Sequence, residues 1–473
     1  MPMDVSKKIE EQRKLLEAGN PKIDISRACR IEDGIQRIQD EEELGLIRLF
    51  EKKAKNLSIC FFVPASGSGS RMFSFLYDFL KAQGDQSSEE LTQHFLNKIE
   101  SFAFYNKLPQ RLKDDIATGD FNFEELIEYL LEKEGLSFSN LPKGLIPFHS
   151  YGSFMITPIQ EHLIQGYYLG GNECTFHFTI NENYKTQILK NKEILEEFTG
   201  LKYNLDWSIQ DPTTNSVAFN ENLTPLEIDG KVVTRPSGHG ALLHNLNSID
   251  SDIVFIRNID NIQHSDKSET SIRTRKLLGA KLIDFRESVK QILQGLEIDF
   301  EVTEKIDFLN HTFNLRLSDE QITDKEFMKS YLNRPMRICG MVVNEGQPGG
   351  GPFWVKNSNG IEQRQIIEKA QLSTQTDQLK LVTRSTHFNP NEIVCYLKDY
   401  KGNKFNLLDF ANSEQYFVVK KKMNGQDITF IENPGLWNGG MANWLTLFYE
   451  IDAKCFSPVK TVLDLLKKPH LED

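Results

Sequence analysis

The sequence predicts an α/β fold with a mainly parallel or mixed central sheet. Residues 58–64 and 252–257 are short, continuous apolar runs rich in β-forming residues, the pattern of strands buried on both faces of a sheet. Residues 174–180 alternate apolar and more polar positions, as a strand does. Apolar residues at helical spacing follow the first run, at residues 72–80. A chain of 473 residues, 39% of them hydrophobic, can bury one large α/β core with insertions or form two or three domains.

The loop after the first apolar run has the composition of a phosphate-binding loop. Its glycines let the backbone approach a ligand, and the helix that follows aims its N-terminal amides at an anion. Arg71 adds a fork of donors. The loop has neither the Gly-Lys-Ser/Thr ending of a Walker loop nor the third glycine of a dinucleotide fingerprint. A plain turn between strand and helix is the alternative. The candidate loop residues are Ala65, Ser66, Gly67, Ser68, Gly69 and Ser70.

Composition narrows the classes of function. The net charge of −12 argues against a nucleic-acid backbone as the main partner. Six scattered cysteines without a C-x-x-C pair argue against a zinc ribbon and against a disulfide framework, and predict reduced, mostly buried thiols. The N-terminus is polar, and no apolar window has the length of a membrane span. We therefore expect a cytoplasmic protein with no membrane partner.

The remaining elements suggest three consecutive parts, at residues 1–55, 56–390 and 391–473. Residues 1–55 are expected to form a helical extension, with apolar residues such as Ile35 at helical spacing. Residues 74–140 read as a helical insertion, and one interpretation is a cap over the site. The last part is expected to be an α+β segment that completes the active site.

Local signals predict three further details. Thr157 and Gln160 form a capping-box pattern around Pro158, which marks the start of a helix. His177, within the predicted strand at residues 174–180, is expected to be a packed ring rather than a ligand. Residues 271–296 are expected to form an amphipathic helix, with Arg273, Arg275 and Lys276 in solvent.

Five motifs resemble those of nucleotide-sugar pyrophosphorylases, the enzymes that include UTP–glucose-1-phosphate and UDP-N-acetylglucosamine pyrophosphorylases, and they occur in the same order. Pro142-Lys143-Gly144 comes about 70 residues after the loop, an interval that requires the insertion to loop out. The motifs are Gly67-Ser68-Gly69-Ser70-Arg71-Met72, Pro142-Lys143-Gly144, Pro236-Ser237-Gly238-His239-Gly240, Asn258-Ile259-Asp260-Asn261 and Phe456-Ser457-Pro458-Val459-Lys460-Thr461-Val462-Leu463-Asp464-Leu465-Leu466.

The resemblance implies a GT-A-like, Rossmann-like nucleotidyltransferase fold. It implies that NTP, with UTP favoured, and a sugar 1-phosphate are the substrates, and that Mg²⁺ is the cofactor. It also implies that Arg71, Lys143 and Lys460 contact the phosphates. Asp260, which comes directly after a buried strand, would bind the metal. The nucleotide would be held by the loop and by Gln210, Pro236, Gly238, His239 and Gly240. Candidate sugar-phosphate contacts are Asn261, Glu345, Gly350 and Asn433.

The chain departs from the family pattern at two places. Lys454-Cys455 stands where the family usually has Ser-Arg, so any role of that arginine is in doubt. The chain also stops soon after the last motif, so the C-terminal β-helix domain of relatives is not expected, and the protein should be a monomer or a weak homo-oligomer. The glycines at residues 349–351 and the loop at 433–443 resemble a bacterial family without assigned activity.

Two other classes of function stay open. A glycosyltransferase would use a ready-made nucleotide sugar, but that class usually shows Asp-x-Asp and has no need of Lys143. A non-catalytic relative would bind the nucleotide or nucleotide sugar without turnover.

Overall fold

The computed structural model describes residues 5–81, 86–298, 301–346, 350–357, 360–423 and 425–472. The chain forms two compact units, each built from separated stretches of sequence. Unit 1 comprises Met1–Cys60, Gln210–Ile256 and Thr274–Ala453, and unit 2 comprises Phe61–Ile209, Arg257–Arg273 and Lys454–Asp473. The units therefore interleave along the chain, whereas the sequence predicts three consecutive parts. No helix among the described residues is long and apolar enough to span a bilayer.

Unit 1 contains a mixed β-sheet. Its neighbouring strands are, in order, β2 (Arg30–Ile31), β3 (Gly34–Gln36), β21 (Leu445–Glu450), β14 (Met336–Val343), β18 (Ile393–Tyr396) and β13 (Ile253–Ile256). The pairs from β2 to β14 are parallel, and β18 is antiparallel to both of its neighbours. Ile35, expected in a helix, is fully buried in β3 opposite Phe448. A sheet contact therefore overrides the helical spacing of the N-terminal extension.

Shorter strands of unit 1 form small additional sheets. β15 (Gly351–Lys356) lies between β1 (Arg27–Ala28) and β16 (Glu362–Ile367), and β17 (His387–Phe388) pairs with the end of β14. The two-stranded pairs are β9 (Ser216–Val217) with β12 (Thr234–Arg235), β10 (Glu227–Ile228) with β11 (Lys231–Val232), and β19 (Phe417–Met423) with β20 (Gln426–Glu432).

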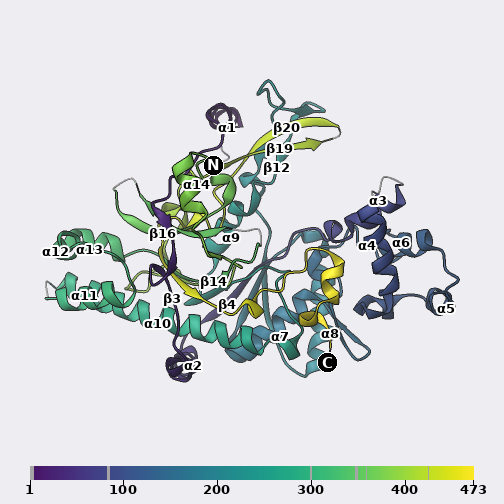
Figure 1. Ribbon diagram of the computed structural model, residues 1–473, viewed down its shortest axis with the longest axis horizontal. Coiled ribbons are helices and arrows are strands. Elements are labelled where there is room, and N and C mark those ends of the chain that lie inside the picture. Colours follow the sequence, from purple (N-terminus) through teal and green to yellow (C-terminus); the bar gives the residue numbers. More distant parts are fainter. Residues whose placement is uncertain are drawn as a thin grey trace. The chain divides into compact units, whose positions relative to one another are not determined.

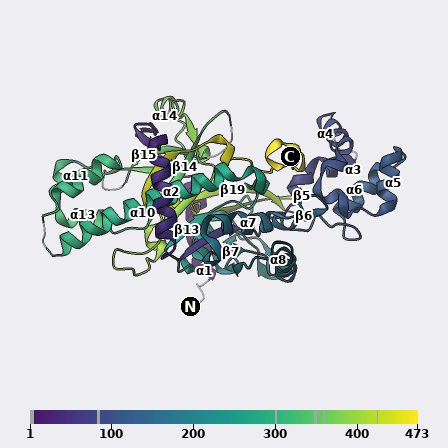
Figure 2. The ribbon, with the colours of Figure 1, turned by 90° about the horizontal axis from the view of Figure 1, so that it is seen from below.

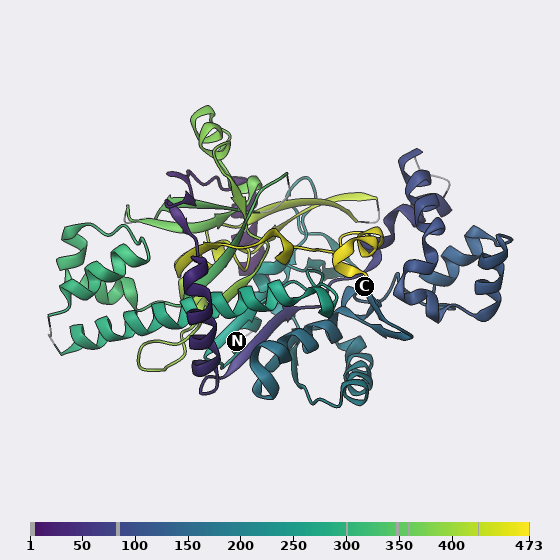
Figure 3. The ribbon, with the colours of Figure 1, turned by 60° about the horizontal axis from the view of Figure 1, so that its bottom comes forward.

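The helices of unit 1 surround these sheets. Figure 3 shows α10 as one long helix, whose first turn belongs to the Arg257–Arg273 stretch of unit 2. α11 to α13 lie side by side in Figures 1 and 2. The helices are α1 (Val5–Ala18), α2 (Asp40–Ala54), α9 (Leu242–Ser248), α10 (Glu269–Glu297), α11 (Thr303–Thr312), α12 (Asp319–Thr323), α13 (Lys325–Leu332) and α14 (Thr376–Val382).

One residue of α10 lies on the wrong side of the predicted amphipathic pattern. Arg273 is exposed as expected. Arg275, predicted to be in solvent, is buried, and its guanidinium forms an ion pair with the buried Glu392 at 3.1 Å. A buried arginine is tolerated because this carboxylate neutralises it. The partner lies 117 residues away in sequence, so no local pattern could reveal it.

Unit 2 contains the strands β5 to β8, the C-terminal part of β4 and the predicted insertion. The C-terminal half of β4 (Ile59–Pro64) belongs to this unit, and its neighbour β7 (Thr175–Thr179) runs parallel to β8 (Asn204–Ser208). β5 (His149–Tyr151) and β6 (Phe154–Ile156) form a hairpin. The helices are α3 (Ser74–Leu80), α4 (Gln86–Asn97), α5 (Gln110–Thr118), α6 (Phe123–Leu131), α7 (Pro158–Gly170) and α8 (Lys185–Thr199).

Two local predictions in unit 2 are confirmed. Thr157 and Gln160 form the capping box at the start of α7, with Pro158 as its first residue. His177 is buried in β7, where its ring nitrogens bond to Asp206 and Ser208 and its ring stacks on Phe62. The six cysteines of the chain are buried, and none of them forms a disulfide, as expected.

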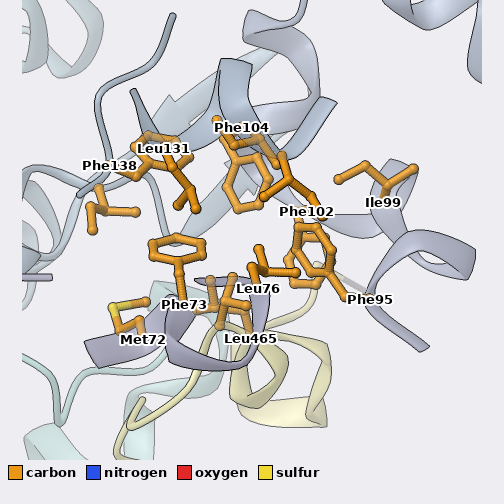
Figure 4. Packing of buried hydrophobic residues seen from close by; sticks show 14 of the residues in the cluster. Met72, Phe73, Leu76, Phe95, Ile99, Phe102, Phe104, Leu131, Phe138 and Leu465 are labelled. Atoms are coloured by element: carbon orange, nitrogen blue, oxygen red, sulfur yellow. The ribbon is translucent and has the colours of Figure 1, made fainter. Parts of the chain in front are cut away.

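The insertion helices α3 to α6 gather into one group (Figure 2) around a phenylalanine-rich core (Figure 4). Phe102 and Phe104 stack at 5.1 Å, and Phe73 stacks on Phe138 at 5.5 Å. The same core contains residues that adjoin the predicted site in sequence, namely Met72, Ile146, Ile262 and Val459. The insertion thus anchors four site-bearing segments, because each segment contributes an apolar residue to this core.

Candidate functional site

The predicted glycine loop leaves β4 at Pro64 and enters a 3₁₀ turn, Ser70–Phe73, that leads into α3. Its backbone is tied to the segment that carries Lys143. The Gly69 amide donates to the Leu141 carbonyl, and the Lys143 amide donates to the Gly67 carbonyl, both at 3.0 Å. These two bonds fix the lysine-bearing turn against the loop, although about 70 residues separate them in sequence.

The exposed part of the loop can bind an anion. Ser66, Gly67 and Ser68 are exposed, and within the described parts of the chain their backbone amides donate to no other group. The Ser70 amide is already used, since it donates to the Ser68 hydroxyl at 3.1 Å. Successive free amides in a turn form a concave anion site. Gly69 serves packing instead, because a Cβ there would meet Ile146 Cδ1 at 2.3 Å.

Lys143, Asp260 and Lys460 form a charged cluster, referred to below as the lysine–aspartate cluster. Both ammonium groups contact the same carboxylate oxygen, Asp260 Oδ2, at 3.0 Å from Lys143 Nζ and 2.9 Å from Lys460 Nζ. Lys143 also donates to the Val459 carbonyl at 2.8 Å. The Lys143 and Asp260 side chains are largely buried, whereas 63% of the Lys460 side chain is exposed. Two cations therefore share one counter-ion.

Burial and neighbouring cations perturb the cluster. Burial lowers the pKa of Lys143, and the charges of Lys460 and Arg71 lower it further, against the opposing attraction of Asp260. For Asp260, burial acts to raise the pKa, but the two lysines outweigh it, so the pKa lies below its ordinary value. The exposed guanidinium of Arg71 is thus close enough to lower the pKa of Lys143. The three predicted phosphate-binding cations lie in one neighbourhood with one carboxylate.

The C-terminal segment, residues 454–472, is held against the Asp260 loop by backbone and side-chain bonds. The Val459 amide donates to the Asp260 carbonyl at 3.0 Å. Asn261, a predicted sugar-phosphate contact, is buried, and both ends of its amide bind this segment: Oδ1 accepts from the Ser457 amide at 2.8 Å and Nδ2 donates to the Cys455 carbonyl at 3.3 Å. These bonds hold the segment that carries Lys460 against the loop that carries Asp260.

Asp464 and Gln263 are functional-site residues that the sequence analysis missed. Asp464 Oδ2 accepts the amides of Lys460 and Thr461 at 2.8 and 2.7 Å, which orders the turn that presents Lys460. Gln263 donates to the Lys454 carbonyl and accepts from the Ser271 hydroxyl. The pattern Thr461-x-x-Asp464 is a capping-box signal and could have revealed the first. Nothing local marks the second.

Unit 1 brings together the predicted base-binding turn and the loop at residues 432–438. His239 accepts a bond from the Leu436 amide at 3.0 Å and stacks on Trp437 at 4.4 Å. A Cβ at Gly240 would meet the Pro434 carbonyl oxygen at 2.2 Å, and one at Gly238 would meet Glu432. Gly240 is therefore required by the packing of one loop on the other, whereas Gly238 is favoured by its backbone φ of +70°.

The remaining predicted ligand contacts of unit 1 have different surroundings. Pro236 and Glu345 are exposed, and Gly350 packs on Ile366. The Asn433 amide donates to the Ser237 carbonyl at 3.0 Å. Gln210 carries a buried amide nitrogen with no partner among the described residues, which suits a residue that binds a ligand. Gly349 lies outside the described residues.

Asp260 can supply one ligand to Mg²⁺. Among the described residues no group of three or more histidine, cysteine, aspartate and glutamate side chains could hold a metal ion. Mg²⁺ at nucleotide sites uses one or two carboxylates and takes its other ligands from phosphates and water. A single buried carboxylate beside two lysines fits that donor set.

The fold is that of the UDP-sugar pyrophosphorylases. The UDP-N-acetylglucosamine pyrophosphorylase from Trypanosoma brucei matches with a TM-score of 0.50 and 12% identity, over 97% of this chain and 74% of that chain. A mutant UDP-glucose pyrophosphorylase from Leishmania major matches with a TM-score of 0.44 and 12% identity, over 98% and 75%. A UDP-glucose phosphorylase from Trypanosoma brucei matches with a TM-score of 0.44 and 13% identity, over 96% and 72%. The first match confirms the predicted α/β fold.

The chain belongs to the family described as a domain of unknown function, DUF4301, whose model matches residues 3–471. No curated protein matches the sequence. The resemblance to a family without assigned activity is thereby confirmed.

Proposed function

We propose that this protein is a Mg²⁺-dependent nucleotidyltransferase that forms a nucleoside-diphosphate sugar from an NTP, with UTP favoured, and a sugar 1-phosphate. The observation that carries the proposal is the lysine–aspartate cluster beside Arg71 and the open amides of the glycine loop. Lys143, Lys460 and Arg71 together carry more positive charge than the single carboxylate of Asp260 neutralises. Such an arrangement is favourable when a polyanion binds there.

The reaction needs alignment and charge neutralisation more than covalent catalysis. A phosphate oxygen of the sugar 1-phosphate attacks the α-phosphorus of the NTP, the new P–O bond forms, and the bond to the β-phosphate breaks to release pyrophosphate. The loop amides and Arg71 would bind phosphate oxygens. Lys143 and Lys460 would leave Asp260 Oδ2 for the phosphates and neutralise the charge that develops on the leaving group. Bound Mg²⁺, held by Asp260, would neutralise phosphate charge further.

A pyrophosphate-release screen tests the proposal. Purified protein is incubated with Mg²⁺, each of the four NTPs and a panel of sugar 1-phosphates, and the released pyrophosphate is quantified. Release is expected with UTP and at least one sugar phosphate, and turnover is expected to fall by on the order of 10² in the Arg71→Ala and Lys460→Ala variants. Release that is unchanged in both variants would rule out this site. Binding of UTP or a UDP-sugar by calorimetry without any release would indicate the non-catalytic alternative.

A further inference from the structure

A buried polar network in unit 2 lies beside the end of the C-terminal segment. At its centre is Glu161, in the first turn of α7, whose side chain is inaccessible to solvent. Three groups at 2.7 Å bond to its carboxylate, namely His149 Nδ1, the Tyr151 hydroxyl and the Ser265 hydroxyl. A fully buried carboxylate with three partners joins the hairpin β5–β6, helix α7 and the loop that follows Asp260.

The network continues into the C-terminal segment through a second histidine. His149 Nε2 and His470 Nδ1 are 3.0 Å apart, and both rings are buried. The His264 amide donates to the Pro469 carbonyl at 2.9 Å, and the Gly152 amide donates to the Glu472 carboxylate at 3.1 Å. Residues 469–472 are thus tied to unit 2 at three points, of which the Glu472 contact lies at the surface.

The proposed catalytic lysine lies on the same segment, ten residues before His470. Between them, the Asp464 carboxylate bonds to the amides of Lys460 and Thr461 and to the ammonium of Lys467. At the other end, Asn261 and the Asp260 carbonyl hold Ser457 and Val459. Because Lys460 is mostly exposed and its side chain is long, its position depends on how firmly these two attachments hold the backbone.

We propose that the chain Glu161–His149–His470 is a clamp that positions Lys460 for the phosphates of the substrate. Glu161 and His470 are positioning residues: they act through the backbone of residues 457–470 and touch no substrate. This inference rests on the proposed role of Lys460. Burial, and to a smaller extent His149, lower the pKa of His470 to about 3, so the ring is neutral over the working range and the clamp stays closed there.

If Glu161 and His470 only stabilised the fold, their variants would behave like a variant of any other buried carboxylate in unit 2. The chain offers such a carboxylate as a matched control. Glu196 in α8 is also a buried carboxylate of unit 2, with Lys192, Lys202 and the Tyr203 amide as partners, and it bonds to no part of residues 454–472. Glu161→Gln and His470→Ala test the clamp, and Glu196→Gln tests the general effect of altering a buried carboxylate. His470→Ala shortens a side chain close to residue 473, so this variant can still test the clamp if Glu161→Gln does not fold.

The first measurement is amide hydrogen exchange of the full chain. In Glu161→Gln and His470→Ala, the amides of residues 457–464 are expected to exchange about tenfold faster or more, whereas the amides of β7 and α8 keep their wild-type protection. In Glu196→Gln the amides of residues 457–464 should be unchanged. Equal protection of residues 457–464 in all three variants would overturn the proposal.

The second measurement is the affinity for inorganic pyrophosphate by calorimetry. His470→Ala is expected to weaken binding about fivefold in the wild-type background, and by less than about twofold in the Lys460→Ala background, because the clamp acts only through that lysine. Additive losses would show that His470 does not act through Lys460. If the wild type does not bind pyrophosphate at all, the proposed function fails, and hydrogen exchange still decides whether the clamp exists.

Discussion

The two units use their predicted site residues in different ways. In unit 2, Lys143, Asp260 and Lys460 come from three distant stretches of sequence and meet at one carboxylate oxygen. In unit 1, the glycines around His239 are explained by contacts with the chain itself, since Gly240 leaves no room for a side chain against Pro434. The charged groups of unit 2 carry more positive charge than one carboxylate neutralises, whereas Gly240 is explained by packing within the chain.

This difference teaches which kinds of motif carry information on function. Two ammonium groups on one buried carboxylate leave an excess positive charge that a polyanion can neutralise. A glycine turn packed on a neighbouring loop satisfies the fold without any ligand. The case for nucleotidyl transfer therefore rests on unit 2, and a role of unit 1 in base recognition stays a prediction that needs separate tests.

The largest expected effect concerns Lys143. Replacing it by alanine should lower turnover by about 10² to 10³, because a preorganised, largely buried phosphate contact is lost. The measurement is the rate of pyrophosphate release with saturating substrates. The control is Lys202→Ala, which removes an exposed lysine of the same unit and should retain the wild-type rate. Equal rates in the two variants would contradict a phosphate-binding role for Lys143.

The packing of unit 1 is tested by a pair of glycine substitutions. Gly240→Ala should lower the free energy of unfolding by about 1–3 kcal/mol, because the new methyl group overlaps the Pro434 carbonyl. Gly45→Ala, in helix α2 with open space around its Cβ position, should instead raise it by about 0.5–1 kcal/mol. Denaturant unfolding of both variants checks the opposite signs. A neutral Gly240→Ala would show that this turn has room for a ligand group instead.

A His239 variant tests whether unit 1 contributes to nucleotide binding. If unit 1 contributes to nucleotide binding, His239→Ala should weaken UTP binding about tenfold by removing the ring that stacks on Trp437 and bonds to Leu436, worth about 1.4 kcal/mol. Inorganic pyrophosphate, which would need only the cations of unit 2, should bind within about twofold of wild type. Calorimetry with both ligands measures the ratio. Parallel loss of both affinities would mean that the effect of His239 is not confined to unit 1.

The smallest expected effect is a shift in pH dependence. Burial and the nearby cations lower the pKa of Lys143, so its ammonium loses its proton at a lower pH than that of a free lysine, and pyrophosphate binding should decline on the alkaline side accordingly. Lys143→Arg keeps its charge throughout this range, so the alkaline decline should move to higher pH. Lys202→Arg should leave the profile where it is. If the alkaline decline in pyrophosphate binding stays at the same pH in Lys143→Arg, the decline is caused by another titrating group.

Local sequence patterns predicted individual elements well. The apolar runs correspond to β4, β7 and β13, and the capping box at Thr157 starts α7 as predicted, because these signals depend on neighbours within a few residues. The spacing that includes Ile35 failed, since a parallel partner in β21 determines its conformation. Arg275 failed for the same reason, because its partner Glu392 is remote in sequence.

The sequence by itself determined which residue types are available to the site, namely a glycine loop, an arginine, two lysines and an aspartate in a defined order. Only the tertiary structure decided that both lysines contact one oxygen of Asp260, that Asn261 and Asp464 hold the segment bearing Lys460, and that a buried glutamate–histidine chain ties down the end of that segment. Local signals act over a few residues of chain, whereas charges and hydrogen bonds act between groups that are close in space. Gln263 and the ion pair of Arg275 were missed for this reason, because folding supplies their partners.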